Sequence, residues 1–415
     1  MAIYGRNPSS AASSSRALST LVGYGCFLAC TQLLWLTYAP ITTRAAADFD
    51  VSDGAVGDLT VVVLVACVVL GILSGRWLDL HFRATLVVGI GMTTAGAVVR
   101  ALDSDSFAAA LIGQSLIGIG QPLVVNAMTK LPALLLPPRT STRAIAALSA
   151  ALFVGMLAAV GLGGPIYRVG GLSLLVGTHA VVTVIAGAAA IATLWRLPVQ
   201  ATEAARTPSS TRTLLRNRVL WLLGGSAFAG FGLFNAMVTW LDPILTDLGR
   251  PGAAGWTGTI MIVAGIASAA IVPNLAGRSD RRSATLLAIA CIGGLVPLAL
   301  ALAPEPFVAT LLLATYGGAA LAGLPLILDF SERLVGAANA ATAAGFVTLV
   351  GNLGGALYVL GIQPLLDDAQ LALIVLGILA LPAGFIATRL PRNINDNSAP
   401  TRLATSYPQE GRTNP

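Results

Sequence analysis

The stretch GAVGDLTVVVLVACVVLGILSGRWLDLHFR, residues 54–83, decides the fold class. Between Asp58 and Arg76 it holds no charged side chain, and its apolar residues follow one another without alternation. A membrane-crossing helix needs about 20 mostly apolar residues, whereas an outer-membrane strand alternates over about ten. The stretch therefore predicts a transmembrane helix that ends in a charged loop near Arg83.

The composition of the whole chain supports the same interpretation. Of its 415 residues, 56% are hydrophobic and 10% are charged, and the mean hydropathy is +0.82. Soluble domains carry about 25% charged residues, so we expect the apolar surplus to face a lipid bilayer. The four cysteines and two histidines show no spacing typical of a zinc or redox site, and we expect no metal and no cofactor.

Apolar runs of this length recur along the chain and predict an all-α membrane protein with twelve transmembrane helices in two six-helix halves. The runs cover residues 18–40, 54–78, 84–101, 107–131, 144–166, 171–195, 218–241, 254–276, 284–303, 307–329, 339–361 and 369–389. The predicted organisation is a cytoplasmic N-terminal tail (1–17), a first bundle (18–195), a cytoplasmic linker (196–217), a second bundle (218–389) and a disordered cytoplasmic tail (390–415).

Basic residues predict the orientation, because cytoplasmic loops carry an excess of Lys and Arg. If the N-terminus is cytoplasmic, all but four of the 24 basic residues fall on the cytoplasmic side. The exceptions are Arg44, Arg100, Arg168 and Arg250. The net charge of +6 is thus explained by topology, and we expect no nucleic-acid partner.

The two halves read as repeats. Gly75 to Asp79 follow the second predicted span, and Gly277 to Arg282 follow the eighth. Parallel six-span repeats, with the substrate site between them near the midplane, are typical of transporters of the major facilitator type.

These motifs also carry a family resemblance. Gly75, Asp79 and Arg83 resemble the loop 2–3 signature of the major facilitator superfamily, although Leu80 and Phe82 stand where the pattern has Arg and Gly. A narrower resemblance, to the feline leukaemia virus subgroup C receptor-related transporters and their prokaryotic relatives, rests on residues 32–38, 113–130, 234–241 and 324–332. That family moves choline and related amines and has been linked to heme, so the resemblance implies transport of an amine.

Two departures from the narrower family bear on the substrate. The family carries an Asn-Gln pair in its fifth span, whereas residues 152–157 here contain no polar pair. The carboxylate at the end of the tenth span is usually Glu in the family and is Asp329 here. The substrate class therefore does not follow from the resemblance alone.

Polar residues inside the apolar runs are the candidates for substrate contact. In the first span Thr31, Trp35, Tyr38 and Thr42 have a spacing that places them on one helical face, and aromatic rings can hold a quaternary amine by cation–π contact. The full set is Thr31, Gln32, Trp35, Tyr38, Gln114, Gln121, Asn126, Asn235, Thr239, Trp240 and Asn352. Hydrogen bonding between helices, or a place in the interfacial aromatic belt, is the alternative for each.

Charges at the predicted cytoplasmic ends are the candidates for a gate. The set is Gly75, Asp79, Arg83, Lys130, Asp280, Arg281, Arg282, Asp329 and Glu332. Because Arg and carboxylate pair with specific geometry, we expect these groups to bridge the halves in the outward-open state; solvated loop charges are the alternative. His179 is the only ionisable group well inside a span, and it is either a proton carrier or a neutral buried histidine.

The sequence as a whole predicts a small-molecule transporter in the cell membrane, not an enzyme. No midplane carboxylate stands out, which favours facilitated diffusion or coupling to a substrate gradient over proton coupling. The alternatives are an exporter of drugs or metabolites and an organic-anion or cyanate-type permease, and more remotely a membrane-embedded enzyme or a receptor. From the resemblance we expect a monomer.

Overall fold

The structure, a computed structural model, describes residues 8–196, 216–278, 281–302, 305–335 and 340–391. In these ranges the chain forms helices joined by turns and short loops. Most of the predicted linker and of the C-terminal tail lies outside the described residues. Among the described residues, eleven helical segments are long and apolar enough to cross a membrane.

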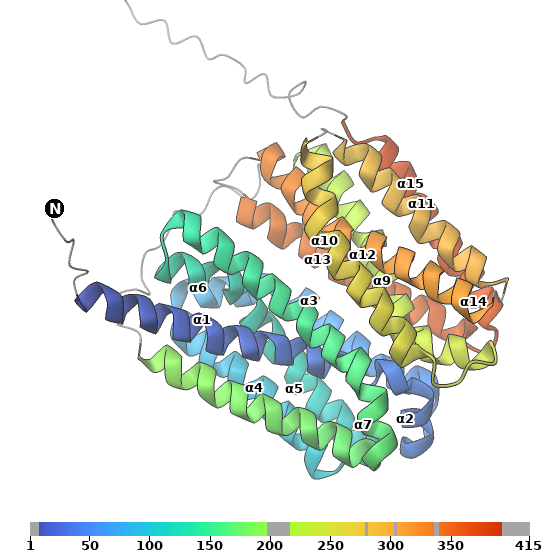
Figure 1. Cartoon of the computed structure of the whole chain (residues 1–415), viewed down its shortest axis with the longest axis horizontal. Coiled ribbons are helices and arrows are strands. Elements are labelled where there is room, and N and C mark those ends of the chain that lie inside the picture. The colour runs from blue at the N-terminus through green and yellow to red at the C-terminus, as the bar shows by residue number, and fades with distance from the viewer. Residues whose placement is uncertain (1–7, 197–215, 279–280, 303–304, 336–339, 392–415) are drawn as a thin grey trace, which may run out of the picture.

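The N-terminal half comprises α1 (Pro8–Trp35), a 3-10 turn η1 (Ala39–Ile41), α2 (Thr42–Phe49), α3 (Asp53–Leu80), α4 (Phe82–Leu102), α5 (Phe107–Val125), α6 (Ala127–Leu135) and α7 (Pro138–Trp195). The C-terminal half comprises α9 (Arg218–Asp247), α10 (Ala254–Arg278), α11 (Arg282–Leu300), α12 (Pro306–Val335), α13 (Ala340–Ile362), η3 (Gln363–Leu365), α14 (Ala369–Leu379) and α15 (Leu381–Thr388). Figure 1 shows the two halves as adjacent bundles, blue to green and yellow to red.

The long helix α7 contains the two predicted spans 144–166 and 171–195 and breaks between them. Gly170 (φ −149°, ψ 24°) and Gly171 (φ 63°, ψ −161°) have non-helical backbone angles. Before the break, a Cβ at Gly25 would touch Leu148 and one at Gly155 would meet Ala29, so this arm runs parallel to α1. After it, a Cβ at Gly23 would meet Thr193, whereas one at Gly187 would meet Phe27. The second arm therefore runs antiparallel to α1, and the chain reverses direction at the two glycines.

Each half begins and ends at the same end of its bundle. The hydroxyl of Thr20, near the start of α1, donates to the carbonyl of Thr193 at the end of α7 (3.3 Å). In the second half, Leu223 near the start of α9 shares an apolar cluster with Ala387 at the end of α15. The chain therefore runs from one end of each bundle to the other an even number of times.

Close helix packing within the halves depends on small residues. A Cβ at Gly96 would collide with the backbone of Gly113, and one at Gly120 would meet that of Gly89, so α4 and α5 can only approach this closely without side chains there. Lipid offers apolar helices no hydrophobic driving force to associate, and close van der Waals contact takes its place.

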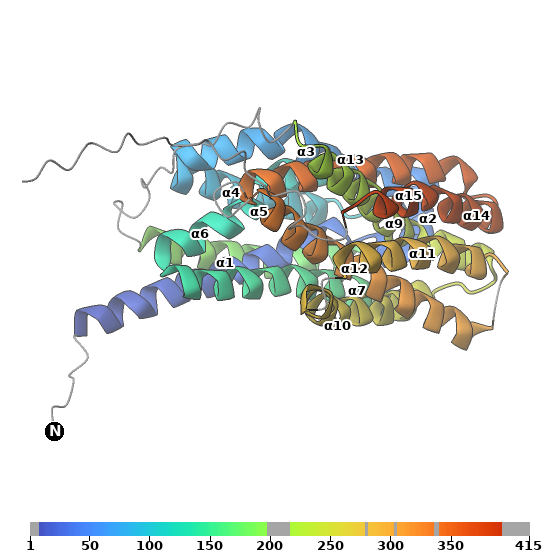
Figure 2. The ribbon, with the colours of Figure 1, turned by 90° about the horizontal axis from the view of Figure 1, so that it is seen from above.

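The halves touch one another mainly at one end, which we call the α2 end because α2 and α14 lie there (Figures 1 and 2). Contacts between halves at this end join Thr43 to Asp242, Gly57 to Trp240, Gly54 to Gln363 and Val160 to Gly258. Further along α3, Cβ atoms at Gly71 and Gly75 would meet open space, as would one at Gly345 on α13. The contacts named between the halves therefore gather at the α2 end, and Figure 1 shows the two bundles diverging toward the opposite end, where α1 begins.

Candidate substrate site

The first predicted span is interrupted where its aromatic residues lie. The helix α1 ends at Trp35, a turn follows, and η1 and α2 continue in new directions. Pro40 has no backbone N–H and its ring crowds the carbonyl four residues earlier, which favours a break here, although α5 and α9 continue through Pro122 and Pro243. The prediction that Thr31, Trp35, Tyr38 and Thr42 share one helical face is therefore wrong beyond Trp35. Tyr38 instead packs edge-on against Phe49, with ring centroids 5.8 Å apart.

A buried arginine forms hydrogen bonds to the residues around this interruption. The sequence analysis did not identify this arginine as part of the site. Arg100, in the last turn of α4, is only 1% exposed. Its Nη1 donates to the carbonyl of Leu34 (3.2 Å) and to Oε1 of Gln114 (2.7 Å), and its Nη2 donates to Oγ1 of Thr37 (3.3 Å). The sequence analysis counts Arg100 among the basic residues on the outer side, at the end of the span 84–101. The available signal was its position within an apolar run, since an arginine inside the membrane is costly.

Gln114 and His179 belong to the same cluster. Gln114 accepts from Arg100 and its Nε2 donates to the carbonyl of Trp35 (3.4 Å), so both ends of the amide have protein partners. Nδ1 of His179 lies 3.0 Å from Oγ1 of Thr37, and the ring is buried. Gln114 is thus engaged in packing in this conformation, and the proton-carrier hypothesis for His179 stays a prediction.

Four other predicted residues present buried polar atoms that have no hydrogen-bond partner in the described part of the chain. These atoms are Nε1 of Trp35, Oε1 of Gln121, Oδ1 of Asn235 and Oγ1 of Thr239. Buried polar groups are nearly always paired, because an unpaired one costs roughly 1–3 kcal/mol. Such atoms on three helices, α1, α5 and α9, are therefore candidates for hydrogen bonding to a substrate.

Two of these side chains lie where the halves meet. A Cβ at Gly355 on α13 would approach both Asn235 and Leu64 of α3, so Asn235 faces the junction of three helices. Trp35 belongs to the same apolar cluster as Phe234 and Leu64. This cluster contains residues of both halves, which places Trp35 and Asn235 at the interface between them.

The remaining predicted substrate residues have other surroundings. Asn126 donates to the carbonyl of Gly71 (3.0 Å) and to Ser74 (2.6 Å), which joins the α5–α6 junction to α3. Trp240 is fully buried and donates from Nε1 to the carbonyl of Val359 (3.0 Å). Thr31, Gln32 and Asn352 complete the set: the hydroxyl of Thr31 bonds its own helix, Gln32 donates to Thr31, and Asn352 is half-buried on α13.

The predicted gate charges form ion pairs inside each half. Lys130 of α6 lies 2.7 Å from Asp79 at the end of α3, and also donates to the carbonyl of Leu78 (2.8 Å). In the second half Arg282 lies 2.6 Å from Asp329, which also accepts from Arg333 (3.2 Å). The ion pairs that the described part of the chain shows for Lys130, Arg282 and Arg333 each join groups of the same half.

The other members of the predicted gate set have varied surroundings. Arg83 lies over the Trp195 ring, with its Cζ 5.5 Å from the ring centroid. Gly75 faces open space, and Arg281 and Glu332 are exposed. Asp280 lies outside the described residues. A gating role for the set stays a prediction.

At the α2 end the contacts between halves are polar as well as apolar. The backbone N–H of Thr43, in the first turn of α2, donates to Oδ2 of the buried Asp242 (3.1 Å). The hydroxyl of Thr42 donates to the carbonyl of Thr239 (3.4 Å). A carboxylate at a helix N-terminus satisfies a free N–H and complements the helix dipole. The second half therefore caps a helix of the first half.

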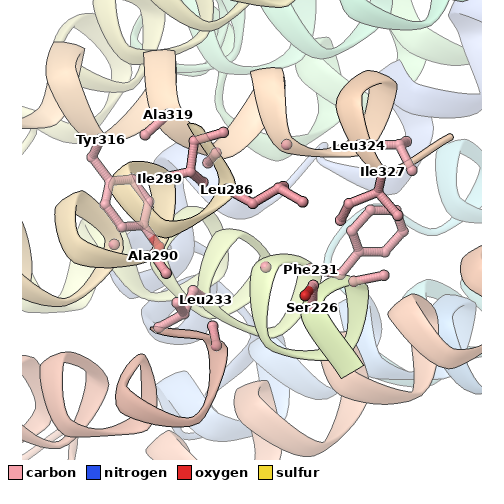
Figure 3. Close-up of a pocket in the computed structure, with 16 residues that line it drawn as sticks. Ser226, Phe231, Leu233, Leu286, Ile289, Ala290, Tyr316, Ala319, Leu324 and Ile327 are labelled. Atoms are coloured by element: carbon pink, nitrogen blue, oxygen red, sulfur yellow. The ribbon is translucent and has the colours of Figure 1, made fainter. Parts of the chain in front are cut away.

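A small cavity inside the C-terminal half was not predicted (Figure 3). It measures about 50 Å³ and lies between α9, α11, α12 and α15. Apolar side chains such as Leu233, Leu286 and Ile327 line it, and the hydroxyl of Tyr316, another lining residue, is buried without a partner. Pockets for organic ligands measure about 300–1,000 Å³, so this cavity is too small to hold a whole substrate.

Comparison with known proteins identifies the family. The Major Facilitator Superfamily model matches residues 20–359. Solute carrier family 49 member A3 of Danio rerio is 30% identical over 365 residues, which is 82% of this chain and 77% of that relative.

Solved transporter structures share the fold. A bacterial homologue of the human lysosomal transporter Spinster, in an inward-facing and unoccupied conformation, has a TM-score of 0.72 at 16% identity, covering 94% of this chain and 99% of that one. The nucleoside transporter NupG has a TM-score of 0.68 at 14% identity, covering 89% and 99%. The chain therefore belongs to the major facilitator superfamily of multi-pass membrane transporters and, within it, to solute carrier family 49.

Proposed function

We propose that the protein is a secondary active or facilitative transporter that moves a small molecule by alternating access between its two halves. The observation that carries the proposal is the set of unpartnered buried atoms on Trp35, Gln121, Asn235 and Thr239. Two of these side chains lie where the halves meet, so a substrate bound there would contact both halves. Closing around it from either end is the geometry that alternating access requires.

In the proposed topology the chain crosses the membrane twelve times and both termini are cytoplasmic. We further propose that the protein acts as a monomer in the cell membrane. The reversal of α7 at Gly170 and Gly171 divides its 58 residues into two arms, each long enough to cross about 30 Å of hydrocarbon. The even number of passes in each half and the excess of basic residues on one side support the same topology. The end at which α1 begins is then cytoplasmic, and the conformation is open to the inside.

The proposed substrate is a small amine such as choline. Trp35 supplies an aromatic face at the interface, and the resemblance to the feline leukaemia virus subgroup C receptor-related transporters points to the same class. The alternative of an anion permease needs a cation facing the substrate. The buried cation Arg100 bonds protein acceptors through both terminal nitrogens, and Lys130 pairs with Asp79 and donates to the carbonyl of Leu78. The amine is therefore the better-supported class.

The test is uptake of radiolabelled choline into proteoliposomes that contain the purified protein. Trp35→Phe keeps a weaker aromatic face, whereas Trp35→Ala removes it. We expect the KM for choline to rise severalfold in Trp35→Phe and by roughly tenfold or more in Trp35→Ala, because cation–π contacts contribute about 0.5–2 kcal/mol.

The matched control is Trp256→Ala, which removes a half-exposed tryptophan at the start of α10. Its KM should equal that of the wild type. Uptake that is absent in the wild-type protein, or that is indifferent to Trp35, would contradict the amine as substrate. A thermal-unfolding panel of neutral metabolites, organic anions and heme then identifies the ligand class, since a ligand of the folded state raises the midpoint.

A further inference from the structure

The interruption of the first span leaves backbone groups that need partners. The last four carbonyls of a helix have no intrahelical donor, and in a membrane no bulk water replaces it. In α1 these are the carbonyls of residues 32–35. The carbonyl of Gln32 accepts from the N–H of Leu36 (3.1 Å), and that of Leu33 accepts from the hydroxyl of Thr37 (3.1 Å).

The carbonyl of Leu34 also accepts from the hydroxyl of Thr37 (3.0 Å), and side chains from two other helices donate to the last two carbonyls of α1. Arg100 of α4 donates to the carbonyl of Leu34, and Gln114 of α5 donates to that of Trp35. Arg100 also donates to Gln114, at 2.7 Å, so the two donors hold one another in place. The last two carbonyls of α1 therefore each accept a hydrogen bond from a side chain whose position is fixed by its neighbour.

Arg100 is a buried cation, and the groups in the described part of the chain that accept its hydrogen bonds are neutral. These acceptors are the carbonyl of Leu34, Gln114 and Thr37, and the Tyr38 ring lies beneath the guanidinium with its centroid 5.5 Å from Cζ. Room for the side chain comes from Gly113, where a Cβ would overlap the Arg100 stem. A methionine of similar length would fill the space without the cost of burying a charge, so packing alone does not explain an arginine here.

We infer that Arg100 and Gln114 are positioning residues that set the backbone and ring of Trp35 at the substrate site. Gln114 donates a hydrogen bond to the carbonyl of Trp35 itself. Arg100 donates to the carbonyl of Leu34 and to the hydroxyl of Thr37, on either side of Trp35 in the sequence. The buried indole N–H of Trp35 has no hydrogen-bond partner among the described residues. The inference rests on the proposed function for its role in transport, but the positioning itself can be measured without any substrate.

The first measurement is ¹⁹F NMR of protein labelled with 5-fluorotryptophan. The Trp35 resonance is assigned by its loss in Trp35→Phe. We expect Gln114→Met and Arg100→Lys each to shift or broaden the Trp35 resonance while the other tryptophan resonances stay in place. Arg100→Lys retains the positive charge of the cluster but removes the guanidinium that bonds Leu34, Thr37 and Gln114 at once. Ser115→Ala, the neighbouring residue of Gln114 on α5, is the control and should shift no resonance.

The second measurement is a double-mutant cycle on transport. Gln114→Met should raise KM about three- to tenfold, the effect of losing one or two hydrogen bonds, but should raise it no further in a Trp35→Ala background. A purely structural role would lower the yield and the maximal rate in both backgrounds. An unchanged Trp35 resonance in both variants overturns the inference. A shifted resonance in a protein that moves no amine supports the positioning and rejects the proposed substrate instead.

Discussion

Trp240 shows how one residue can look like a ligand contact in the sequence and join helices in the fold. It lies on α9 in an apolar stretch near Asn235 and Thr239, which is why we predicted substrate contact. In the structure its ring rests on Gly57 of α3, where a Cβ would overlap it, and its N–H bonds the carbonyl of Val359 on α13. Three helices from both halves thus meet on one side chain at the α2 end.

The glycine under this ring gives a prediction at the residue scale. Gly57→Ala should force the halves apart at the α2 end and lower the free energy of unfolding by about 1–3 kcal/mol, the usual penalty for overpacking. Thermal unfolding in detergent measures the change. Gly71→Ala on the same helix is the matched control, because a Cβ there meets open space, and it should leave the midpoint unchanged or slightly higher.

Two helical elements are defined by where they break. The helix α1 ends at Trp35, ahead of Pro40, which has no backbone N–H to continue the ladder, and Arg100 and Gln114 donate hydrogen bonds to its free carbonyls. The helix α7 reverses at Gly171, whose φ of 63° with ψ of −161° is a backbone conformation that is accessible almost only to glycine. The sequence analysis predicted two separate spans around this point, and the structure joins them by a reversal that has no loop.

The reversal gives a prediction at the element scale. Gly171→Ala should lower the free energy of unfolding by about 1–3 kcal/mol, because the added Cβ makes the required backbone angles strained. Gly177→Ala is the control: it lies one and a half turns later in the regular part of α7, where a Cβ meets open space. Equal unfolding midpoints for the two variants would show that the turn tolerates a side chain.

At the scale of the whole molecule, the two ends of the bundles differ in how the halves are connected. The α2 end is closed by Trp240 on Gly57 and by Asp242, which caps α2 from the opposite half. At the other end Lys130–Asp79 and Arg282–Asp329 stabilise each half separately. We interpret these pairs as charges that exchange partners when that end closes. The predicted ion pairs between the halves would then form only in the outward-open conformation.

The gate gives a prediction at the scale of the molecule. Asp79→Asn should slow transport by about two- to fivefold, since an ion pair whose carboxylate is 76% exposed contributes up to about 1 kcal/mol. Uptake into proteoliposomes measures the rate. Asp105→Asn, a loop residue at the α2 end, should behave as the wild type. A wild-type rate in Asp79→Asn would remove Asp79 from the gate.

The sequence by itself determined the helical membrane architecture, because the length of an apolar run is a local quantity, whereas the orientation that the basic residues indicate stays a prediction. It also suggested Trp35, Gln121, Asn235 and Thr239 as candidates for substrate contact, since a polar residue in an apolar run is visible without a fold, and that role stays a prediction. Only the tertiary structure decided the rest. Arg100 resembled a loop cation because it ends a run, and its partners Leu34 and Gln114 are distant in sequence. The break after Trp35 and the pairing of charges within each half depend on which helices pack together, and packing between distant segments leaves no periodic pattern in the chain.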